Sequence, residues 1–200
     1  CTATVTFNIT QPPAIVVTPV SQTDISCNGG SNGSATVNAS NGTPAYTYAW
    51  TPSGGTAATA SGLSAGTYTC TVTDANSCTA TQTFNITEPS AITSANSQTN
   101  ISCNGVNDGI ATVTVSGGTP GYTYSWSPSG GTAATASGLT AGNYTCTITD
   151  ANSCTATATF NITEPVAIAV TNSQTDVSCN AGNNGTATVT VSGGTPAYTY

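Results

Sequence analysis

The chain has 200 residues and a formal net charge of −7, because it contains seven carboxylates and no Lys, Arg or His. Without cationic side chains it lacks a basic nucleic-acid-binding surface, and without His it lacks the commonest acid/base catalyst and zinc ligand. We therefore expect no enzyme activity and no nucleic-acid partner. No apolar run approaches the roughly 20 residues that span a bilayer, so we also expect no membrane insertion.

The chain is rich in hydroxyl side chains, with 43 Thr and 22 Ser. The Thr residues alternate with Val, Ile, Ala and Tyr, and this alternation of β-branched residues favours many short strands over a disordered coil. The eight Cys residues stand at regular spacings with no His to share a metal, which indicates disulfides and an oxidising, extracellular location. The composition predicts an all-β extracellular protein that needs no cofactor.

The sequence repeats with a period of 76 residues. Cys27, Cys103 and Cys179 are separated by this interval, and residues 52–63 are identical to residues 128–139. We expect the last strand of one repeat and a linker in residues 1–15, complete repeats in residues 16–92 and 93–168, and the first part of another repeat in residues 169–200. The chain is thus expected to be a portion of a longer array.

Turn residues recur about every 8 to 12 positions within the first complete repeat, a spacing typical of a β-sandwich. After a first strand that ends at Cys27, Asn32-Gly33 is predicted to form a tight hairpin turn with positive φ. Further strands are expected at residues 34–39, 46–50, 56–60, 67–73 and 78–87, with the turn residues Asp74–Ser77 in the closing hairpin. We expect seven short strands per repeat, of which these segments are six.

Two features of the repeat are typical of immunoglobulin-like sandwiches. Trp50 is expected to point inward from the third strand, and Tyr68 stands two residues before Cys70, as in a tyrosine corner. Tyr46 and Tyr48 alternate with Trp50, and we interpret all three as core, the alternative being a sugar-stacking platform. These features predict an all-β fold of tandem immunoglobulin-like β-sandwich repeats, each of about 76 residues, forming an elongated array.

Several distinct motifs occur in one order and at one spacing, twice in full: Ser26-Cys-Asn-Gly29, Gly33-Ser-Ala-Thr-Val37, Gly42-Thr-Pro-Ala-Tyr-Thr-Tyr48, Ala65-Gly-Thr-Tyr-Thr-Cys-Thr-Val-Thr-Asp-Ala-Asn76 and Ile86-Thr-Glu-Pro89. In these motifs the chain resembles the SprB-type repeat of gliding-motility and cell-surface adhesins over essentially its whole length. The resemblance implies very large surface proteins of gliding bacteria that are exported by the type IX secretion system and act as adhesive filaments. The closing hairpin also resembles that of PKD-like domains, which are extracellular spacers.

Each repeat carries three Cys residues, so at least one per repeat must be unpaired or bonded outside its own repeat. We favour the disulfides Cys27–Cys70 and Cys103–Cys146, because the first strand is expected to end near the strand that carries the second Cys of each pair. The competing pairing is Cys27 with Cys78, which would leave Cys70 a buried thiol. The candidates for bonds between repeats or for free thiols are Cys1, Cys78, Cys154 and Cys179.

The closing-hairpin loops contain the oxygen ligands that calcium takes, at Asp74, Asn76, Asp150 and Asn152. Each loop supplies only one carboxylate, which is too few to favour a calcium site. We therefore prefer the interpretation that each Asp caps its own turn, and we expect no other metal.

We interpret the chain as the repetitive stalk of a large extracellular cell-surface adhesin filament. Its expected partners are neighbouring repeats of the same chain, other copies of the filament, and surface or polysaccharide ligands bound through parts outside residues 1–200. One alternative is a self-assembling extracellular fibre or sheath, because the chain has no Lys to block pairing at strand edges. Another alternative is a carbohydrate-binding or spacer module of a secreted enzyme.

Overall fold

The computed structural model describes residues 1–200, which divide into two compact units, residues 1–91 and 92–200. The first unit contains β1 (Val16–Thr23), β2 (Gly33–Ser40), β3 (Thr47–Thr51), β4 (Thr59–Leu63), β5 (Gly66–Thr73) and β6 (Thr79–Ile86). The second contains β7 (Thr93–Thr99), β8 (Gly109–Ser116), β9 (Thr123–Ser127), β10 (Thr135–Leu139), β11 (Gly142–Thr149), β12 (Thr155–Ile162), β13 (Ala169–Thr175) and β14 (Thr186–Ser192). No helix long and apolar enough to cross a membrane occurs in the structure.

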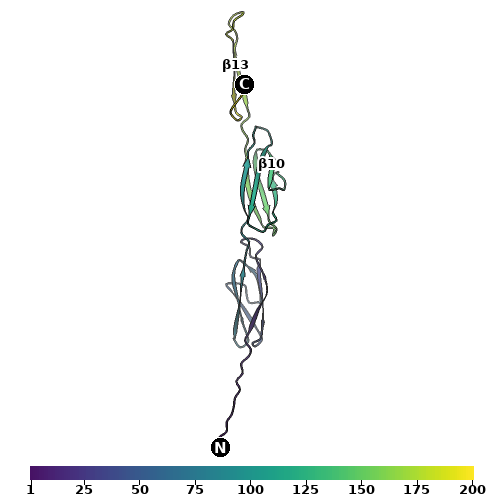
Figure 1. The fold of residues 1–200 in the computed structure, drawn as a ribbon, viewed down its shortest axis with the longest axis vertical. Coiled ribbons are helices and arrows are strands. Elements are labelled where there is room, and N and C mark those ends of the chain that lie inside the picture. The colour runs from purple at the N-terminus through teal and green to yellow at the C-terminus, as the bar shows by residue number, and fades with distance from the viewer. The chain divides into compact units, whose positions relative to one another are not determined.

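Two three-stranded antiparallel sheets form a sandwich in the first unit (Figure 1). One sheet has the order β1-β2-β4 and the other the order β3-β5-β6. The second unit repeats this arrangement as β7-β8-β10 and β9-β11-β12, and β13 pairs with β14 as β1 does with β2. The predicted fold class, all-β with tandem immunoglobulin-like repeats, is confirmed.

Each complete repeat has six strands, one fewer than the sequence predicts. In immunoglobulin lettering the two sheets are A-B-E and C-F-G, so strand D is absent. The chain passes from β3 to β4 through residues 52–58 only, and Gly54 and Gly55 adopt φ values of 131° and 84° there. A connection this short, with two consecutive positive φ angles, leaves no extended segment that could pair as a seventh strand.

The core of each sandwich is complete within its own repeat. The Trp50 ring lies 5.7 Å from the Phe84 ring between centroids, and its Nε1 donates a hydrogen bond to the carbonyl oxygen of Ala57 at 2.9 Å. Tyr46 and Tyr48 pack against this core from partly buried positions. The three aromatic residues therefore belong to the core, as predicted, and do not form an exposed sugar-stacking platform.

The tyrosine corner predicted from the sequence is present in the second repeat. The Tyr144 hydroxyl donates to the carbonyl oxygen of Thr140, four residues upstream, at 3.1 Å. Tyr144 itself is buried, two residues before the buried Cys146. This bond ties the start of β11 to the loop before it, which is how the corner acts in immunoglobulin-like domains.

Residues 1–15 form no strand, although they match the last strand of a repeat in sequence. Phe7 and Ile9 are 82% and 93% exposed. Their equivalents in β6, Phe84 and Ile86, are 5% and 1% exposed, because β6 pairs with β5 along its whole length. The same residues are therefore a strand only where a sandwich buries them, and local β propensity alone is insufficient.

Asn32-Gly33 does not form the predicted hairpin turn, because neither residue has a positive φ. The Asn32 side chain instead accepts a hydrogen bond from the Ser26 N–H at 3.1 Å and donates one to the Ser26 hydroxyl at 2.6 Å. A Cβ on Gly33 would lie 2.7 Å from Cγ2 of Ile86 and 2.8 Å from the carbonyl oxygen of Leu63. Asn32 therefore closes the loop of residues 26–32, which we name the cysteine loop, and Gly33 is required by close packing.

This packing role gives a test at Gly33. Gly33→Ala should lower the free energy of unfolding by about 1–3 kcal/mol, because the new methyl group overpacks the core. Gly33→Asn should cost more, since the larger side chain meets the same atoms. Equilibrium unfolding in urea measures both changes.

Gly29 is the matched control, because it has a φ of 73° and no atom within 4 Å of where a Cβ would stand. Asn accepts a positive φ more readily than Ala does. At Gly29 the Asn variant should therefore be the milder one. If Gly33→Asn also destabilised the protein less than Gly33→Ala does, the packing role of Gly33 would be contradicted.

Candidate functional site: the two ends of each repeat

The chain enters each complete repeat at one end of the sandwich and leaves at the other. At the entrance end of the first repeat, the Gly42 N–H donates to the carbonyl oxygen of Pro13 at 3.1 Å. At the exit end, the Ile25 N–H donates to the carbonyl oxygen of Thr87 at 2.9 Å. Strand β6 runs from the entrance end to the exit end, and its eight residues extend about 26 Å.

A hairpin loop of residues 74–78 closes the entrance end and is organised by one buried carboxylate. Asp74 is 6% exposed, and its two oxygens accept hydrogen bonds from the backbone N–H groups of Thr43, Asn76 and Cys78, each at 2.9 Å. One side chain thus joins the β2–β3 turn to the β5–β6 loop. Asp150 repeats these bonds in the second repeat, with Thr119, Asn152 and Cys154 as donors.

These N–H donors favour the ionised form of the carboxylate. The backbone hydrogen bond from Thr43, followed by those from Cys78 and Asn76, holds the pKa of Asp74 below its ordinary value of 3.8. The hydrogen bond from Thr119 has the same effect on the pKa of Asp150. A negative charge is therefore held at the entrance end of each repeat by peptide dipoles alone, since the chain has no cationic side chain.

The same hydrogen bonds bear on the calcium hypothesis. The oxygens of Asp74 and Asp150 already accept three N–H groups each, and no three His, Cys, Asp or Glu residues gather in a way that could hold a metal ion. Calcium at Asp74, Asn76, Asp150 and Asn152 stays a prediction to which the geometry adds no support. The turn-capping role that we preferred from the sequence agrees with the observed bonds.

The cysteine loop lies at the exit end, against the segment that leaves the repeat. The Asn28 side chain donates to the carbonyl oxygen of Pro89 at 3.1 Å, and the Gly29 N–H donates to the Glu88 carboxylate at 2.5 Å. Asn104, Gly105, Glu164 and Pro165 make the same two contacts in the second repeat. The loop is therefore fixed to the exit segment by both a side chain and the backbone.

Two more polar groups brace the exit end. Asp24 accepts a hydrogen bond from the Thr87 N–H at 3.0 Å, and this bond, with one from Gln22, lowers the pKa of Asp24. In the second repeat Asn100 accepts from the Thr163 N–H at 3.2 Å. Since Asn replaces Asp here with the same bond, the exit end needs an acceptor at this position and not a charge.

The cysteine loop of the second repeat is closed by a carboxylate in place of Asn32. Asp108 accepts hydrogen bonds from the Ser102 hydroxyl at 2.5 Å and from the Ser102 N–H at 3.1 Å. The hydroxyl and then the N–H of Ser102 lower the pKa of Asp108. Asn and Asp are thus interchangeable in this role.

The Cys residues occupy three different environments. Cys70 and Cys146 are fully buried free thiols within strands, and burial raises the pKa of each. Cys27 and Cys154 are disulfide-bonded. The remaining free thiols are exposed: Cys1, Cys78, Cys103 and Cys179.

The disulfides favoured from the sequence, Cys27–Cys70 and Cys103–Cys146, are therefore not formed. Cys70 pairs with Trp50 and Gln82 in the middle of its sheet, about 13 Å along the strand from Gly66 and about 10 Å from Thr73. Disulfide-bonded residues have Cα atoms no more than about 7 Å apart. The sequence identified the strand of Cys70 but did not show that its side chain lies near neither end of the sandwich.

The competing pairing of Cys27 with Cys78 is not formed either, since Cys78 is a free thiol. Cys27 lies in the exit-end loop and Cys78 in the entrance-end loop, with the full length of β6 between them. The three Cys residues of one repeat thus lie at its exit end, its centre and its entrance end. No two of them are within disulfide distance.

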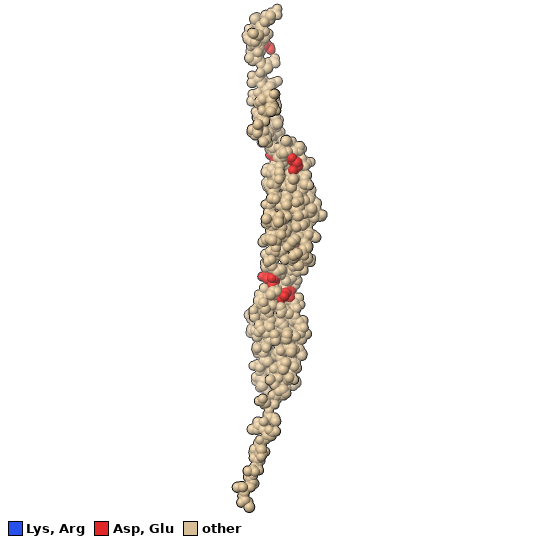
Figure 2. Space-filling model, in the orientation of Figure 1, with Lys and Arg blue, Asp and Glu red and all other residues tan.

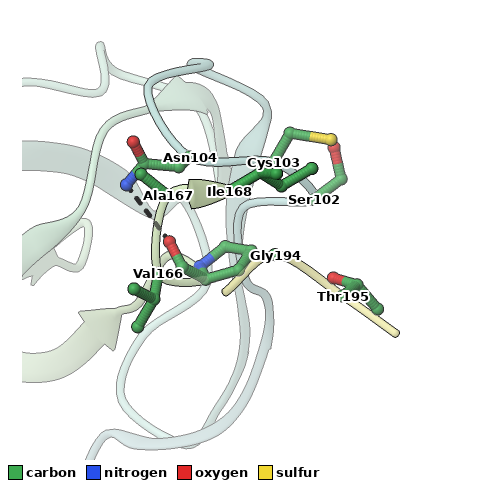
Figure 3. A pocket seen from close by; sticks show the side chains of 9 residues that line it. Ser102, Cys103, Asn104, Val166, Ala167, Ile168, Gly194 and Thr195 are labelled. Carbon is green, nitrogen blue, oxygen red and sulfur yellow. Dashed lines mark hydrogen bonds between the residues drawn. The ribbon is translucent and has the colours of Figure 1, made fainter. Parts of the chain in front are cut away.

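A hollow of about 390 Å³ lies beside the cysteine loop of the second repeat (Figure 3). Its lining comes from the cysteine loop, the exit segment and the β14 turn: Ser102, Cys103, Asn104, Pro165, Val166, Ala167, Ile168, Gly194 and Thr195. The Asn104 side chain donates a hydrogen bond to the carbonyl oxygen of Pro165 at 3.1 Å, and a dashed line from the Asn104 amide marks a hydrogen bond across the lining in Figure 3. The lining contains no carboxylate and no cation, so it offers no paired groups for acid/base chemistry.

Charge is sparse on the face of the molecule that Figure 2 shows, where a few carboxylates interrupt an otherwise uncharged surface. The strands themselves carry none of the seven carboxylates; all lie in loops and linkers. The broad faces of the sandwiches are therefore neutral and covered mainly by hydroxyl-bearing side chains.

Comparison with known proteins identifies the repeat. The family model described as SprB repeat matches residues 20–55, 95–131 and 171–200, which together make up just over half of the chain. The matched segments begin in β1, β7 and β13 and include the cysteine loop each time. With its fold, this match makes the chain a set of tandem immunoglobulin-like repeat modules of the extracellular, adhesin type. It belongs to the SprB repeat family, whose repeats occur in cell-surface proteins.

No curated protein matches the chain. Among solved structures, one that addresses Dscam isoform specificity is 14% identical and has a TM-score of 0.34, with 76% of this chain and 46% of that chain covered. Immunoglobulin domains 1–5 of Sidekick-1 are also 14% identical, with a TM-score of 0.38 and coverage of 92% and 46%. The chain therefore spans less than half the length of these two structures.

The hydrogen bonds of Asp74 and Asp150 predict a defined pH dependence of stability. Because their folded-state pKa lies below the ordinary value of 3.8, the stabilisation is present above about pH 4 and is lost as the pH falls through the folded-state pKa. Thermal unfolding followed by circular dichroism should show a constant midpoint from pH 7 to about pH 5 and a falling one below pH 4.

Replacing both carboxylates, Asp74→Asn and Asp150→Asn, should lower the midpoint at pH 7 and flatten its fall in acid, because an amide NH₂ then faces a backbone donor. The matched control is Asp24→Asn, which should change the midpoint at pH 7 little, since Asn100 already makes the equivalent bond. A double variant with the wild-type midpoint and acid dependence would contradict the role of these carboxylates.

Proposed function

We propose that these repeats form the structural stalk of a large extracellular adhesin filament, of the kind that serves gliding motility and surface attachment. The repeats have no catalytic work in this proposal. They span distance and carry load between the cell and whatever the filament binds. Membership of the SprB repeat family and the disulfide-bonded cysteines support an extracellular, surface-attached role.

The observation that carries the proposal is the position of the chain at the two ends of each sandwich. The entrance contacts of Pro13 and the exit contacts of Thr87 lie at opposite ends of β6. A repeat connected in this way adds its full length, on the order of 35–40 Å with loops, to an array. Length then grows with copy number, which is what a stalk needs and what a single binding domain does not.

The terminal strands also suit the repeat to carry load. β1 and β6 both run from the entrance end to the exit end, and β1 is hydrogen-bonded to β2 from Val16 to Thr23. A force along the array would pull β1 and β6 in opposite directions along their own axes. The hydrogen bonds of β1 are then loaded together in shear, so that many must break at once before the strand moves.

Side-chain bonds connect the same two strands where the load would leave the repeat. The Gln22 amide donates to the carbonyl oxygen of Asn85 at 2.8 Å, and Asp24 accepts from the N–H of Thr87. The second repeat has Gln98 bonded to Asn161 at 2.7 Å in the same place. These bonds join the end of the first strand to the end of the last strand, outside the backbone ladders.

Small-angle X-ray scattering on residues 1–200 tests the proposal. A compact globule of this length would have a radius of gyration of about 16 Å. The stalk should give a clearly larger value, with a cross-section the width of one sandwich and no dependence on protein concentration. A radius of gyration near that of the globule would contradict the stalk.

A concentration series in the same experiment separates the stalk from a self-assembling fibre. Forward scattering per unit mass that stays constant indicates single threads. A steady rise with concentration would indicate lateral or end-to-end association, favoured by strand edges without Lys, and would make assembly the function instead. Electron microscopy of the native filament on cells should then show ordered bundles and not single beaded threads.

A further inference from the structure

Each complete repeat encloses one free thiol in its core. In the first repeat this thiol is Cys70, which is fully buried in the middle of β5, opposite Trp50 and Gln82. A second free thiol, Cys78, is exposed in the hairpin loop that follows, eight positions later in the sequence. The β5–β6 hairpin therefore carries two free thiols, one buried and one accessible.

The folded hairpin keeps these two thiols apart. The Asp74 N–H donates to the carbonyl oxygen of Cys78 at 3.0 Å, and the Cys78 N–H donates to the Asp74 carboxylate at 2.9 Å, so Cys78 lies opposite Asp74. Cys70 precedes Asp74 by four residues of extended chain, a separation of about 13 Å. Disulfide-bonded residues have Cα atoms no more than about 7 Å apart, so Cys70 and Cys78 cannot bond while the hairpin is intact.

Burial also protects Cys70 from oxidants. Its side chain belongs to the hydrophobic core of the first repeat, and this burial raises the pKa of its thiol. The thiolate is the form that attacks a disulfide, and a fully buried sulfur is out of reach of an oxidant in solution. Cys70 is therefore inert in the folded repeat and becomes reactive only when the sandwich opens.

Unfolding changes the relation between the two thiols. A loop of this length closes in well under a microsecond in an unfolded chain. Groups joined by so short a flexible segment meet at an effective concentration in the millimolar range. Cys27, the other Cys of the repeat, is already disulfide-bonded and lies 43 positions from Cys70. Cys78 is thus the nearest free thiol to Cys70 in the unfolded repeat.

We propose that the first repeat contains a redox lock: once the repeat unfolds in the presence of a small disulfide oxidant, Cys70 and Cys78 bond to each other and the repeat cannot refold. Small disulfides of this kind persist in oxidising compartments outside the cytoplasm. The lock is set by unfolding and not by the oxidant alone, because the folded sandwich withholds Cys70.

The chemistry of the lock is ordinary thiol–disulfide exchange. The exposed Cys78 thiolate attacks the oxidant, which forms a mixed disulfide and releases one thiol. The Cys70 thiolate, freed by unfolding, then attacks the Cys78 sulfur, forms the Cys70–Cys78 bond and releases the second thiol. Two electrons pass from the protein to the oxidant, and the two protons of the Cys thiols are balanced by those on the two released thiols.

The strand register explains why the bonded hairpin cannot refold. In the native hairpin Cys70 pairs with Gln82. A bond between Cys70 and Cys78 would set these two residues opposite each other, which shifts the two strands by four residues. Phe84 would then be displaced by about 13 Å along β5, and the contact of its ring with that of Trp50, at 5.7 Å between centroids, would be lost. The bond therefore excludes the native core.

The second repeat differs from the first at this site. Cys146 is a buried free thiol like Cys70, but Cys154, eight positions later, is already disulfide-bonded. The hairpin of the second repeat thus has no second free thiol for an oxidant to join to Cys146. The oxidant-dependent lock therefore belongs to the first repeat.

The mechanical consequence rests on the proposed stalk function, whereas the lock itself does not. A repeat that unfolds under load lengthens the stalk, and without the lock it can refold when the load falls. With Cys70 bonded to Cys78 the repeat would stay extended, because the bond holds closed only eight residue steps, about 28 Å. A single overload would thus lengthen the stalk permanently.

Peptide mapping tests the bond. Residues 1–200 are incubated with oxidised glutathione at slightly alkaline pH, with and without urea, then alkylated and digested with pepsin in acid, which prevents further exchange. Mass spectrometry should find Cys70 bonded to Cys78 after unfolding and an unbonded Cys70 in the folded sample. A Cys70 that stays unbonded after unfolding, that bonds to another partner, or that bonds to Cys78 without urea would overturn the proposal.

Refolding tests the lock. After removal of urea, the circular dichroism of the wild type treated with oxidised glutathione should fall short of that of an untreated sample by about the signal of one repeat. Cys78→Ser should prevent this loss, and we expect it to fold, because residue 78 is exposed and its backbone makes the bonds to Asp74.

The matched control is Cys103→Ser, which removes another exposed free thiol and should lose the same signal as the wild type. Full recovery of the oxidised wild type, or a loss that Cys78→Ser does not prevent, would overturn the lock. Repeated stretching of single molecules in oxidised glutathione measures the consequence. The second pull should show one unfolding event fewer in the wild type than in Cys78→Ser.

Failure of the lock and failure of the stalk are distinguishable. A compact scattering profile together with the Cys70–Cys78 bond after unfolding would reject the stalk and keep the lock. An elongated profile together with full refolding in the presence of oxidant would reject the lock and leave the stalk standing.

Discussion

The first and last strands of each sandwich run in the same direction, and the rest of the structure depends on this constraint. With β1 and β6 both directed from the entrance end to the exit end, the chain must enter and leave at opposite ends. Loops that touch the incoming chain and loops that touch the outgoing chain are therefore separated by a full strand length. The hairpin loop with Asp74 belongs to the first kind and the cysteine loop to the second.

The absence of cationic side chains determines how the carboxylates at the two ends of each repeat are satisfied. Since the chain has no Lys, Arg or His, no carboxylate can be paired with a cationic side chain, and each ordered one must be satisfied by N–H and O–H donors. Asp74 and Asp150 do this with three backbone N–H groups each, and Asp108 does it with Ser102. Such bonds are local and depend little on ionic strength, so repeats that are fixed in this way would hold their geometry across a wide range of salt.

The sequence predicts what depends on alternation and spacing within one strand. The burial of Trp50 and the tyrosine corner at Tyr144 follow from residues two positions apart on the same face, and both were found. Strand positions were likewise predictable, because turn residues separate the alternating runs. What could not be predicted depends on contacts between residues far apart in sequence. Gly33 looks like a turn glycine beside Asn32, and only its approach to Ile86 and Leu63 shows that it is a packing glycine.

The cysteine pairings failed for the same reason. The sequence places Cys27 at the end of one strand and Cys70 within another. It does not show how far apart these two residues lie along the strand direction of the sandwich. The structure puts Cys70 opposite Gln82, at mid-strand, and Cys27 beyond the strand ends. The hydrogen bond from Asn28 to Pro89 that fixes Cys27 spans 61 residues and has no signature in local pattern. Calcium at the hairpin loops stays a prediction, since the residue types suit the ion and the Asp74 oxygens already accept backbone donors.

An odd number of Cys residues per repeat has a simple physical meaning in a tandem array. One Cys in each repeat, Cys70 or Cys146, is buried where no oxidant or partner reaches it, so it serves as a small apolar core residue. Two remain, one at each end, and neither can reach the other within a folded repeat.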